Sequence, residues 1–587
     1  MPHIDKTPSP RYITITQHIH LTAPRINSPE IIGTSMLKGQ RMNLKLQFLA
    51  ALCILLPSYA YSTPQEKKTQ NAIADIAIRE TLIPIRPGGV NNRPFWNTYA
   101  KQFMYVPSFE FAKAEQAHSY RFEAEDRFSI IHSFCADSPT APLTPIWKAI
   151  PTGPVYLTVH ALDKNGKKIS TVGTRVFYRS APFRNGYPPA DRSYADAAKM
   201  TYNYLFNLKV IQQLADGDPD LNFALYCYPS KMYSSIITGM VNYAEMVPEK
   251  KERALAIACG AADYLIKKSV PEGQKLEYLP QTYEGNKRTA KKYGGTIMMI
   301  YPASVGSAMI KLHKATGNTK YIDYAIKIGD QYLKLQLENG SWHLILNIAD
   351  GKPRKDNYCI PTPIMDFLEQ LSDATGNSRY RAAAQKGMSH LQRTLESFNW
   401  EGQFEDIEAQ VIPYHNLTLH SAVSMFLYLC RGSCVSPERL RQAREVLRFA
   451  EDQFIVWEQA GWAGSSTTNE WRTKEELQIK KWNWFRAYHV PCGLEQYRCY
   501  VPVDSASAKI ARFFLLMYKL EKNPVDLAKA RALCDSLTRL QEKNGRIPTW
   551  AQNERNTANT NLDWFNCMFY SADTLKMLSE LSGCNRD

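Results

Sequence analysis

The sequence predicts a mainly α-helical protein in which a ring of six helical hairpins follows a small β-sandwich. Three observations predict this fold. Strand-like alternation is confined to about residues 120–178, helical periodicity begins near residue 191, and a helix–turn–helix pattern recurs after about 59 residues. With 587 residues, 44% of them hydrophobic, the chain is long enough for a large core and more than one domain.

The first 60 residues read as segments that precede the folded protein. Residues 1–41 show no helical or strand period, so we expect them to be disordered or an upstream mis-assigned start. Lys45, an apolar run at 48–56 and small residues after it indicate a signal peptide at 42–60, although a buried strand or helix is the alternative. The run is too short to span a bilayer, so we expect an exported protein, periplasmic or secreted, without a membrane span.

Residues 64–182 are expected to form the β-sandwich. Short runs of alternating β-branched and aromatic residues are separated by Pro-rich connections, and Asn165-Gly166 is a hairpin turn between the last two runs. The predicted strands are 120–124, 128–134, 155–160 and 169–178. This segment resembles the immunoglobulin or fibronectin type III modules that precede catalytic domains in exported bacterial enzymes, which implies a supporting or orienting role.

The helical repeat is clearest at two turns. The sequence Leu312-His-Lys-Ala-Thr-Gly-Asn-Thr matches Leu371-Ser-Asp-Ala-Thr-Gly-Asn-Ser. Each reads as a helix end, a glycine at the C-cap, and Thr319 or Ser378 as the cap of the next helix. Weaker copies lie at 247–255, 434–440 and 521–530.

Counting through this repeat gives twelve helices within a domain at 190–582. The inner helices of a closed ring are covered on both sides and should be the more apolar set. We expect outer helices at 191–214, 250–268, 318–336, 378–395, 436–457 and 525–541, and inner helices at 229–246, 302–316, 362–375, 418–431, 503–521 and 567–582.

The connections between these helices are of two unequal kinds. Links from an inner to the next outer helix are short turns, whereas links from an outer to the next inner helix are long. In a ring of antiparallel hairpins the long links emerge on one face, and long ordered loops usually carry function. The predicted long links are 269–301, 337–361, 396–417, 458–502 and 542–566.

Two acidic clusters lie in these links. The segment 399–406 ends in Glu405 and Asp406 and is followed by His415. Glycosidic cleavage needs one group that protonates the leaving oxygen and another that activates water or attacks carbon, and carboxylates do both. We therefore predict these three residues as catalytic, together with Glu495 in the second cluster. The alternatives are a solvated acidic loop and an ion pair of Glu495 with Arg498.

Aromatic and basic residues of the same links suit a sugar with a carboxylate. Rings stack on a pyranose, and an arginine fork binds a carboxylate bidentately. The formal charge of +15 also suits a polyanion, although scattered surface lysine is the alternative. Phosphate-loop, nucleophile-elbow and zinc motifs are absent from the sequence, so we expect a carbohydrate partner, no nucleic acid, no metal and no cofactor. The predicted substrate-binding residues are Trp400, Tyr283, Tyr414, Tyr497, Arg498, Arg546 and Trp484.

The β-module, the six hairpins, Glu338-Asn-Gly-Ser-Trp and the Thr-Gly-Asn turns resemble the six-hairpin glycosidase superfamily of (α/α)6 toroids, over about residues 190–582. That superfamily includes unsaturated uronyl hydrolases and β-glucuronidases of glycoside hydrolase family 154. Related toroids include polysaccharide lyases and uronyl epimerases. The whole chain looks like exported proteins of Bacteroidetes polysaccharide utilisation. No catalytic motif matches residue by residue.

The acidic clusters and basic residues of the long links, which we expect on one face, lead to the first hypothesis: a glycoside hydrolase that acts on an acidic, uronate-containing glycan. A uronate lyase with His415, Tyr414 or Tyr497 as the base, or an epimerase on the same toroid, is the second hypothesis. A glycan-binding protein without activity is the third.

Overall fold

The computed structural model describes residues 64–84, 102–109, 111–397, 402–405, 419–432, 434–458, 490–495, 503–549 and 563–583. The expected upstream segment and signal peptide lie outside these residues. Among the residues in these ranges, we find no helix of the length and apolarity that crossing a membrane requires.

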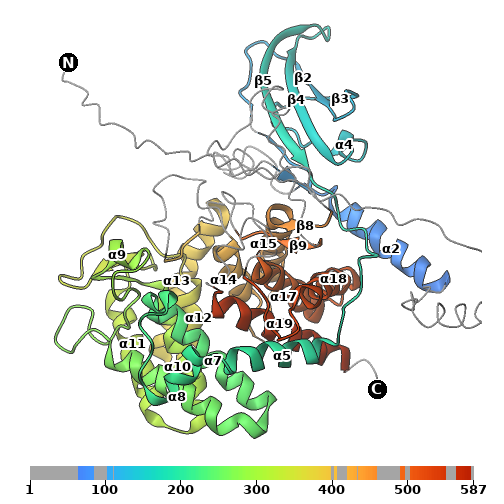
Figure 1. Cartoon of the computed structure of the whole chain (residues 1–587). Helices are drawn as coiled ribbons and strands as arrows, with labels where there is room; N and C mark the ends of the chain where they lie inside the picture. Colours follow the sequence, from blue (N-terminus) through green and yellow to red (C-terminus); the bar gives the residue numbers. More distant parts are fainter. Residues whose placement is uncertain are drawn as a thin grey trace, which may run out of the picture. The chain divides into compact units, whose positions relative to one another are not determined.

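Six inner helices form a closed ring, which confirms the predicted toroid (Figure 1). Each contacts the next in chain order, and the last contacts the first. The ring consists of α7 (Pro229–Met246), α10 (Ile300–Thr316), α12 (Thr362–Thr375), α14 (Leu419–Leu429), α17 (Asp504–Glu521) and α19 (Phe565–Gly583).

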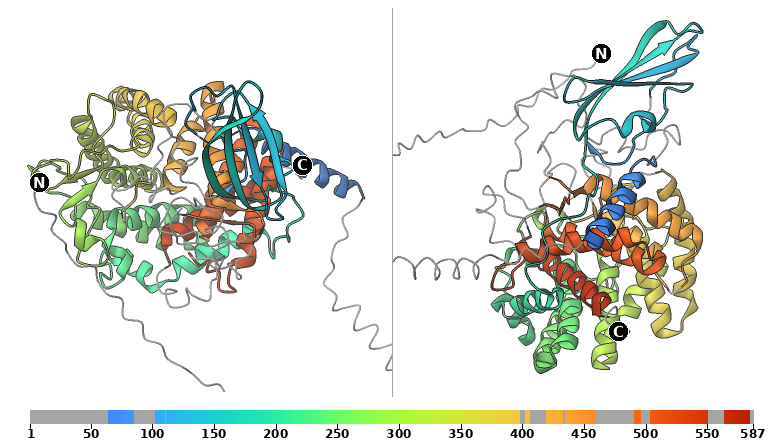
Figure 2. Two further views of the ribbon diagram at one scale, coloured as in Figure 1. Left: turned by 90° about the horizontal axis from the view of Figure 1, so that it is seen from above. Right: turned by 90° about the vertical axis from the view of Figure 1, so that its right-hand side faces the viewer.

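Six outer helices pack around this ring, as the two views of Figure 2 show from other directions. They are α5 (Tyr194–Phe206), α8 (Lys251–Lys267), α11 (Thr319–Leu335), α13 (Ser378–Ser397), α15 (Pro437–Phe454) and α18 (Pro524–Leu540). The first is shorter than expected, because α6 (Lys209–Gln212) and a 3-10 turn at Gln213–Asp216 occupy the rest of the predicted range. The other boundaries agree within a few residues.

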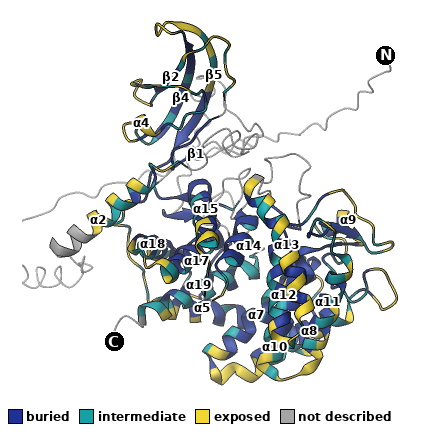
Figure 3. Ribbon diagram, turned by 180° about the vertical axis from the view of Figure 1, so that it is seen from behind, coloured by how far each residue is buried: buried dark blue, intermediate teal, exposed yellow. Residues whose placement is uncertain are grey.

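Inner helices approach one another closely, as their apolar sequences predict. The rings of Phe426 and Phe513 stack between α14 and α17 with their centroids 4.0 Å apart. Gly239 of α7 leaves room for the ring of Phe569 from α19, which would lie 2.2 Å from an added Cβ. Outer helices keep an exposed stripe instead, visible in yellow along α13 in Figure 3.

The Thr-Gly-Asn turns form as predicted except for the capping residue. Gly317 ends α10 in the left-handed conformation with φ of 70°. The side chain of Asn318, rather than Thr319, then accepts a hydrogen bond from the backbone N–H of Lys320. Asparagine sits one residue earlier and already has the extended backbone of an N-cap, so its side chain reaches this N–H first. The turn at Gly376 repeats the pattern.

The β-segment has the four predicted strands, and within the described residues they belong to one sheet. Strands β2 (Ser119–Glu125), β3 (Ile131–Ala136), β4 (Gly153–Leu162) and β5 (Lys168–Arg179) form one sheet with β1 (Gln102–Phe103), in the order β1-β5-β4-β2-β3. All pairs are antiparallel except β1 with β5. Asn165-Gly166 makes the predicted turn, with φ of 78° at the glycine.

A second sheet facing this one, which a sandwich requires, is not among the residues described for the segment. The connection between β3 and β4 instead forms α4 (Thr144–Trp147), and its Trp147 ring stacks on Phe177 of the sheet at 6.0 Å between centroids. Phe109 packs on the same ring at 5.4 Å. Within the described residues, these aromatic side chains cover the sheet where a second sheet was expected.

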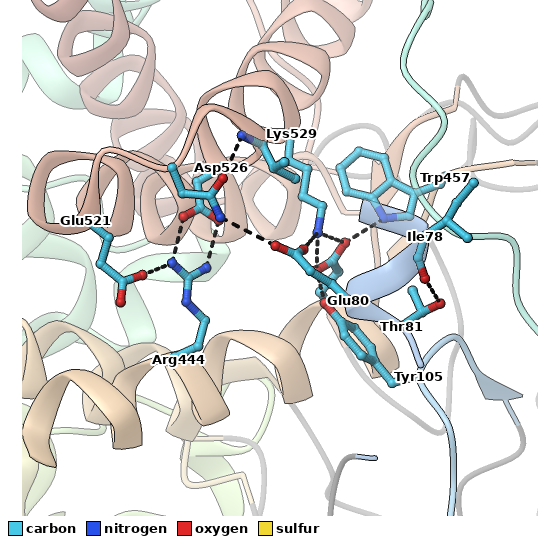
Figure 4. A network of polar contacts seen from close by, with 12 residues as sticks. Ile78, Glu80, Thr81, Tyr105, Arg444, Trp457, Glu521, Asp526 and Lys529 are labelled. Carbon is cyan, nitrogen blue, oxygen red and sulfur yellow. Dashed lines mark hydrogen bonds and ion pairs between the residues drawn. The ribbon is translucent and has the colours of Figure 1, made fainter. Parts of the chain in front are cut away.

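The N-terminal helix α2 (Pro64–Glu80) is attached to the helical domain by a buried charge network (Figure 4). Lys529 of α18 lies 3.2 Å from Glu80 and 2.9 Å from Glu451 of α15. Tyr105 and Trp457 donate further hydrogen bonds to Glu451, at 2.7 and 3.0 Å. Lys529 and Glu451 are both buried, and the charge of each is compensated by the opposite charge of the other.

Candidate active site

The long connections meet at one end of the ring. Each runs from the C-terminal end of an outer helix to the N-terminal end of an inner helix, and successive connections are joined by hydrogen bonds or short strands. We call this end, the N-terminal ends of the inner helices with the connections before them, the mouth. The joining contacts are Glu284 N to Cys227 O (2.9 Å), Ile360 N to the side chain of Gln403 (2.8 Å), Leu419 N to Glu495 O (3.1 Å), Asp504 N to Thr549 O (3.2 Å), and β6 (Thr296–Met298) with β7 (Ile345–Asn347). Within the connection from α15 to α17, β8 (Ile455–Val456) pairs with β9 (Cys492–Gly493).

Glu405 is held at the mouth by side chains from two inner helices. It is 1% exposed, and its Oε1 lies 2.5 Å from Nζ of Lys231 in the first turn of α7. The hydroxyl of Tyr301, in the first turn of α10, donates a hydrogen bond to Oε2. Tyr283 donates to the backbone carbonyl of Glu405 at 3.1 Å. Glu405 therefore sits where helices α7 and α10 and two long connections converge.

The electrostatics around Glu405 favour Tyr301 as a hydrogen-bond donor. Burial, and then the neighbouring charge of Glu405, raise the pKa of Tyr301 well above its usual value. The phenol consequently keeps its proton at neutral pH. Both oxygens of Glu405 accept hydrogen bonds, which is the bonding pattern of an ionised carboxylate. The arrangement suits activation of water or attack on carbon more than donation of a proton.

An aromatic wall adjoins this carboxylate. Nζ of Lys231 lies 4.2 Å from the ring centre of Trp564, the residue before α19. Tyr228 stacks on Trp564 with centroids 5.8 Å apart, and Arg288 lies over the same indole at 5.4 Å. Trp564 is only partly buried, so it offers an indole beside the charged cluster.

A second ion pair, Glu495 with Lys509, lies beside the first. Nζ of Lys509 on α17 is 2.8 and 2.9 Å from the two carboxylate oxygens. Burial, and then the charges of Lys509 and Lys231, lower the pKa of His420 to about 3. His420 of α14 lies between the two ion pairs: its ring is 6.3 Å from that of Phe404, the residue before Glu405, and the backbone N–H of Leu419 donates to the carbonyl of Glu495 at 3.1 Å. Among the described residues, the ion-pair partner of Glu495 is Lys509, and the alternative pair with Arg498 lies outside the described ranges.

Asp504, the first residue of α17, is a buried carboxyl. Val503 occupies the N-cap, so Asp504 does not cap the helix by its position. Its Oδ2 has no hydrogen-bond partner among the residues described, and burial, followed by the charge of Asp563, raises its pKa well above the usual value. A carboxyl whose pKa is raised keeps its proton to a higher pH than an ordinary carboxyl, which is the property that a general acid needs.

Arg546 is engaged by acidic neighbours. Its Nε lies 2.5 Å from Oδ2 of Asp563, and its Nη1 contacts Glu542. A substrate carboxylate would have to compete with these two groups. Asp563 also accepts a hydrogen bond from the backbone N–H of Thr549, at 3.0 Å, which fixes it beside the start of α19.

The structure thus brings Glu405, Tyr283 and Glu495 of the predicted set to the mouth and places Arg546 in ion pairs beside Asp504. Sequence reasoning did not single out Lys231 or Lys509, although both follow a long connection within two turns of an inner helix. The other predicted site residues lie outside the described ranges and stay predictions: Asp406, His415, Trp400, Tyr414, Tyr497, Arg498 and Trp484.

No model of a known protein family matches the sequence, and no curated protein matches it. Among solved structures, the chain is similar to a family 76 glycoside hydrolase from a bovine Bacteroides thetaiotaomicron strain, with 11% identity, a TM-score of 0.42, and coverage of 81% of this chain and 94% of that one. A D-mannose isomerase is similar with 12% identity and a TM-score of 0.46, over 67% of this chain and 99% of that one. An unsaturated glucuronyl hydrolase specific for heparin is similar with 9% identity and a TM-score of 0.41, over 66% of this chain and 98% of that one. Similarities this low assign no chemistry.

Proposed function

We propose that this chain is a carbohydrate-active enzyme with its active site at the mouth, and that it hydrolyses glycosidic bonds in an acidic, uronate-containing glycan. The observation that carries the proposal is the meeting of two lysine-paired carboxylates at the N-terminal ends of inner helices, next to a partly exposed indole. The paired carboxylates are Glu405 and Glu495.

The chemistry requires two carboxyl groups with different roles. Glu405, which accepts hydrogen bonds through both oxygens, fits the group that activates water or attacks the anomeric carbon, and Asp406 follows it in the chain. Protonation of the leaving oxygen needs a group that carries a proton at neutral pH. Asp504, whose pKa burial raises, joins Glu495 and His415 as a candidate for that role.

The substrate class follows from the cations and the aromatic wall. Lys231 and Lys509 place two positive charges near His420, which remains uncharged at neutral pH because its pKa is lowered to about 3. Glu405 and Glu495 compensate these two charges, and Arg288, which lies 5.4 Å from the ring centre of Trp564, adds a further cation that attracts an anionic sugar from solution. The indole of Trp564 supplies a face on which the apolar side of a pyranose can stack.

Export and family membership are part of the proposal. A signal peptide at 42–60 would direct the protein to the periplasm or outside the cell. The six-hairpin toroid with an N-terminal β-module then fits the glycosidases of Bacteroidetes polysaccharide utilisation, near glycoside hydrolase family 154. Sequencing the N-terminus of the protein recovered from its host tests the cleavage site, and a mature chain that begins at Met1 or Met42 contradicts export by this peptide.

Activity against uronate-containing oligosaccharides tests the assignment. We test three variants, Glu405→Gln, Asp406→Asn and Glu495→Gln. In at least one of them kcat should fall by about 100-fold or more, the usual contribution of a general acid or base. Release of new reducing ends is the measurement. Glu438→Gln is the matched control, because Glu438 lies on outer helix α15 and pairs with Arg441 at 2.8 Å.

Four outcomes contradict the proposal. If all three variants cleave the substrate as the parent does, these residues are not catalytic. A product with the ultraviolet absorbance of a conjugated uronate identifies a lyase, and inversion at a carbon without chain cleavage identifies an epimerase. Oligosaccharide binding with no turnover over long incubation identifies a glycan-binding protein.

A further inference from the structure

A hollow outside the mouth lies along outer helix α11. Its volume is about 490 Å³, within the range of about 300–1,000 Å³ typical of small-ligand pockets. Four of its residues on α11 follow the spacing i, i+3, i+4, i+7 and therefore share one face of the helix. The lining residues are Tyr278, Lys327, Asp330, Gln331, Leu333, Lys334 and Arg379.

Among the residues that the structure describes, the cations of this hollow differ in their pairing. Arg379 pairs with Asp330 at 3.3 Å, and Lys334 pairs with Glu277 at 3.1 Å. Lys327, in contrast, has no carboxylate within ion-pair distance among the described residues. Its Nζ lies 4.4 Å from the ring centre of Tyr278. An anionic group entering the hollow would therefore meet an uncompensated lysine beside an aromatic ring.

Tyr278 is held in this place by a strained backbone. Its φ is 67°, a left-handed value that is unfavourable for a bulky side chain. The backbone N–H of Tyr278 donates to the carbonyl of Val270 at 2.8 Å, which fixes the turn. Strained conformations of this kind gather at functional sites, where the structure around them determines a side-chain position.

The hollow is connected to the mouth by a short stretch of chain. Tyr283, which contacts Glu405, follows Tyr278 by five residues, and five residues span at most about 18 Å. The α11 residues of the hollow also lie in the half of the helix that leads into the next long connection. A single extended glycan chain could occupy both places.

We propose that this hollow is a distal subsite for a uronate unit of an extended acidic glycan whose cleaved bond lies at the mouth. The sugar carboxylate pairs with Lys327, and the sugar ring lies against Tyr278. This inference rests on the proposed function and deepens it, because it makes the protein select for chain length as well as for charge.

Binding of long and short oligogalacturonates to the Glu405→Gln protein, measured by calorimetry, tests the subsite. We expect Lys327→Ala to weaken binding of the long oligomer by about 5-fold or more, the loss of a modest charge contact, and to leave the disaccharide unaffected. Tyr278→Asn should also weaken binding of the long oligomer, because the ring that contacts the sugar is lost. Asparagine is chosen because it tolerates the left-handed backbone at this position. In the parent protein Lys327→Ala should raise KM for the long oligomer only, with kcat unchanged.

Lys320→Ala is the matched control. Lys320 lies on the same helix, over Tyr321 at 5.0 Å, but it pairs with Asp263 at 2.7 Å and is outside the hollow. We expect this variant to bind both oligomers as the parent does. A neutral oligosaccharide of the same length should bind equally to all variants.

The outcomes separate this inference from the proposed function. If Lys327→Ala binds both oligomers as tightly as Lys320→Ala, the subsite is wrong even where Glu405→Gln abolishes cleavage. Equal weakening for the disaccharide and the long oligomer also overturns it. If long-chain binding depends on Lys327 but no glycan is cleaved, the hydrolase is wrong and the binding site stands.

Discussion

At the scale of single residues, the mouth depends on charges that compensate one another. Glu405 is almost fully buried, and an unpaired carboxylate there would be strongly destabilising. Its partner Lys231 lies 174 residues earlier in the sequence. The contact therefore exists only because the ring places α7 beside the connection that carries Glu405. Local sequence patterns therefore cannot predict this ion pair.

Asp452 should make the stability depend on pH. It accepts hydrogen bonds from the backbone N–H groups of Met104 and Tyr105 at 2.6 and 2.8 Å, and burial raises its pKa from 3.8 to about 7. Between these pH values the folded state binds more protons than the unfolded state, so this group's contribution to stability is lost as pH rises through about 7.

Urea unfolding of Asp452→Asn across this range is the measurement. Because the amide does not ionise, the variant should gain stability relative to the parent as the pH rises from about 4 to about 8. Exposed Asp137→Asn is the control and should show no such trend. A difference between Asp452→Asn and the parent that stays constant over this range would contradict the prediction.

At the scale of elements, the same hydrogen-bonding motif joins two pairs of neighbouring outer helices, and we call it the clasp. In each copy the side-chain amide of a glutamine that follows an outer helix donates hydrogen bonds to two backbone carbonyls. One belongs to a glycine four residues later, and the other to the neighbouring outer helix. The first copy joins α11 to α13, and the second joins α18 to α5, where the last hairpin meets the first. The contacts are Gln336 with Gly340 O (3.0 Å) and Ala383 O (2.8 Å), and Gln541 with Gly545 O (3.3 Å) and Ala197 O (2.7 Å).

The glycine of the clasp should tolerate no side chain. Gly545 has φ of 94°, and an added Cβ would lie 2.2 Å from the carbonyl oxygen of Met200 on α5. Gly545→Ala should therefore lose about 2–4 kcal/mol, since the left-handed backbone and the overpacking both contribute. Gly273→Ala is the control, because its φ is 85° with nothing within 4 Å of an added Cβ.

We expect Gly273→Ala to lose only about 1–2 kcal/mol, the cost of the backbone conformation alone. Thermal unfolding of both variants compares the two values. Equal losses would show that Gly545 is required for its dihedral angle and that the close approach of α5 is unimportant.

At the scale of the whole molecule, the N-terminal segment and the helical domain share a buried charge. Lys529 lies between Glu80 and Glu451, and Glu451 also accepts a hydrogen bond from the hydroxyl of Tyr105. Helix α2, residues near 105 and outer helices α15 and α18 thus meet at one lysine. Their stability should respond together when it is removed.

Lys529→Met should destabilise the protein by about 3–5 kcal/mol, because Glu451 would remain buried without its cation. Denaturant unfolding measures this loss. Lys543→Met, at an exposed position, is the matched control and should change stability by less than about 0.5 kcal/mol.

Adding Glu451→Gln to Lys529→Met should restore part of the loss, since the stranded charge is then gone. If the double variant is no more stable than Lys529→Met, the destabilisation comes from lost packing instead of the unpaired carboxylate.

Much of the fold was predictable because its signals are local. The Thr-Gly-Asn turns, the capping residues and the spacing of apolar side chains placed all twelve helices, and the unequal connections predicted a common mouth. What covers the sheet was not predictable, because alternation in a strand shows that one face is buried without showing whether a sheet or a helix covers it.

By itself, the sequence determined the bounds of eleven of the twelve ring helices to within a few residues, that six hairpins follow a strand-rich segment, and which connections carry acids and aromatic rings. These properties depend on residues within a few positions of one another. Only the tertiary structure decided that Glu405 pairs with Lys231 and that Glu495 pairs with Lys509. It also decided that Lys327 lies over the ring of Tyr278 with no ion-pair partner in the described part of the chain. Such pairings join segments far apart in the chain, and they are set by ring closure, which brings opposite charges together in a space that excludes water.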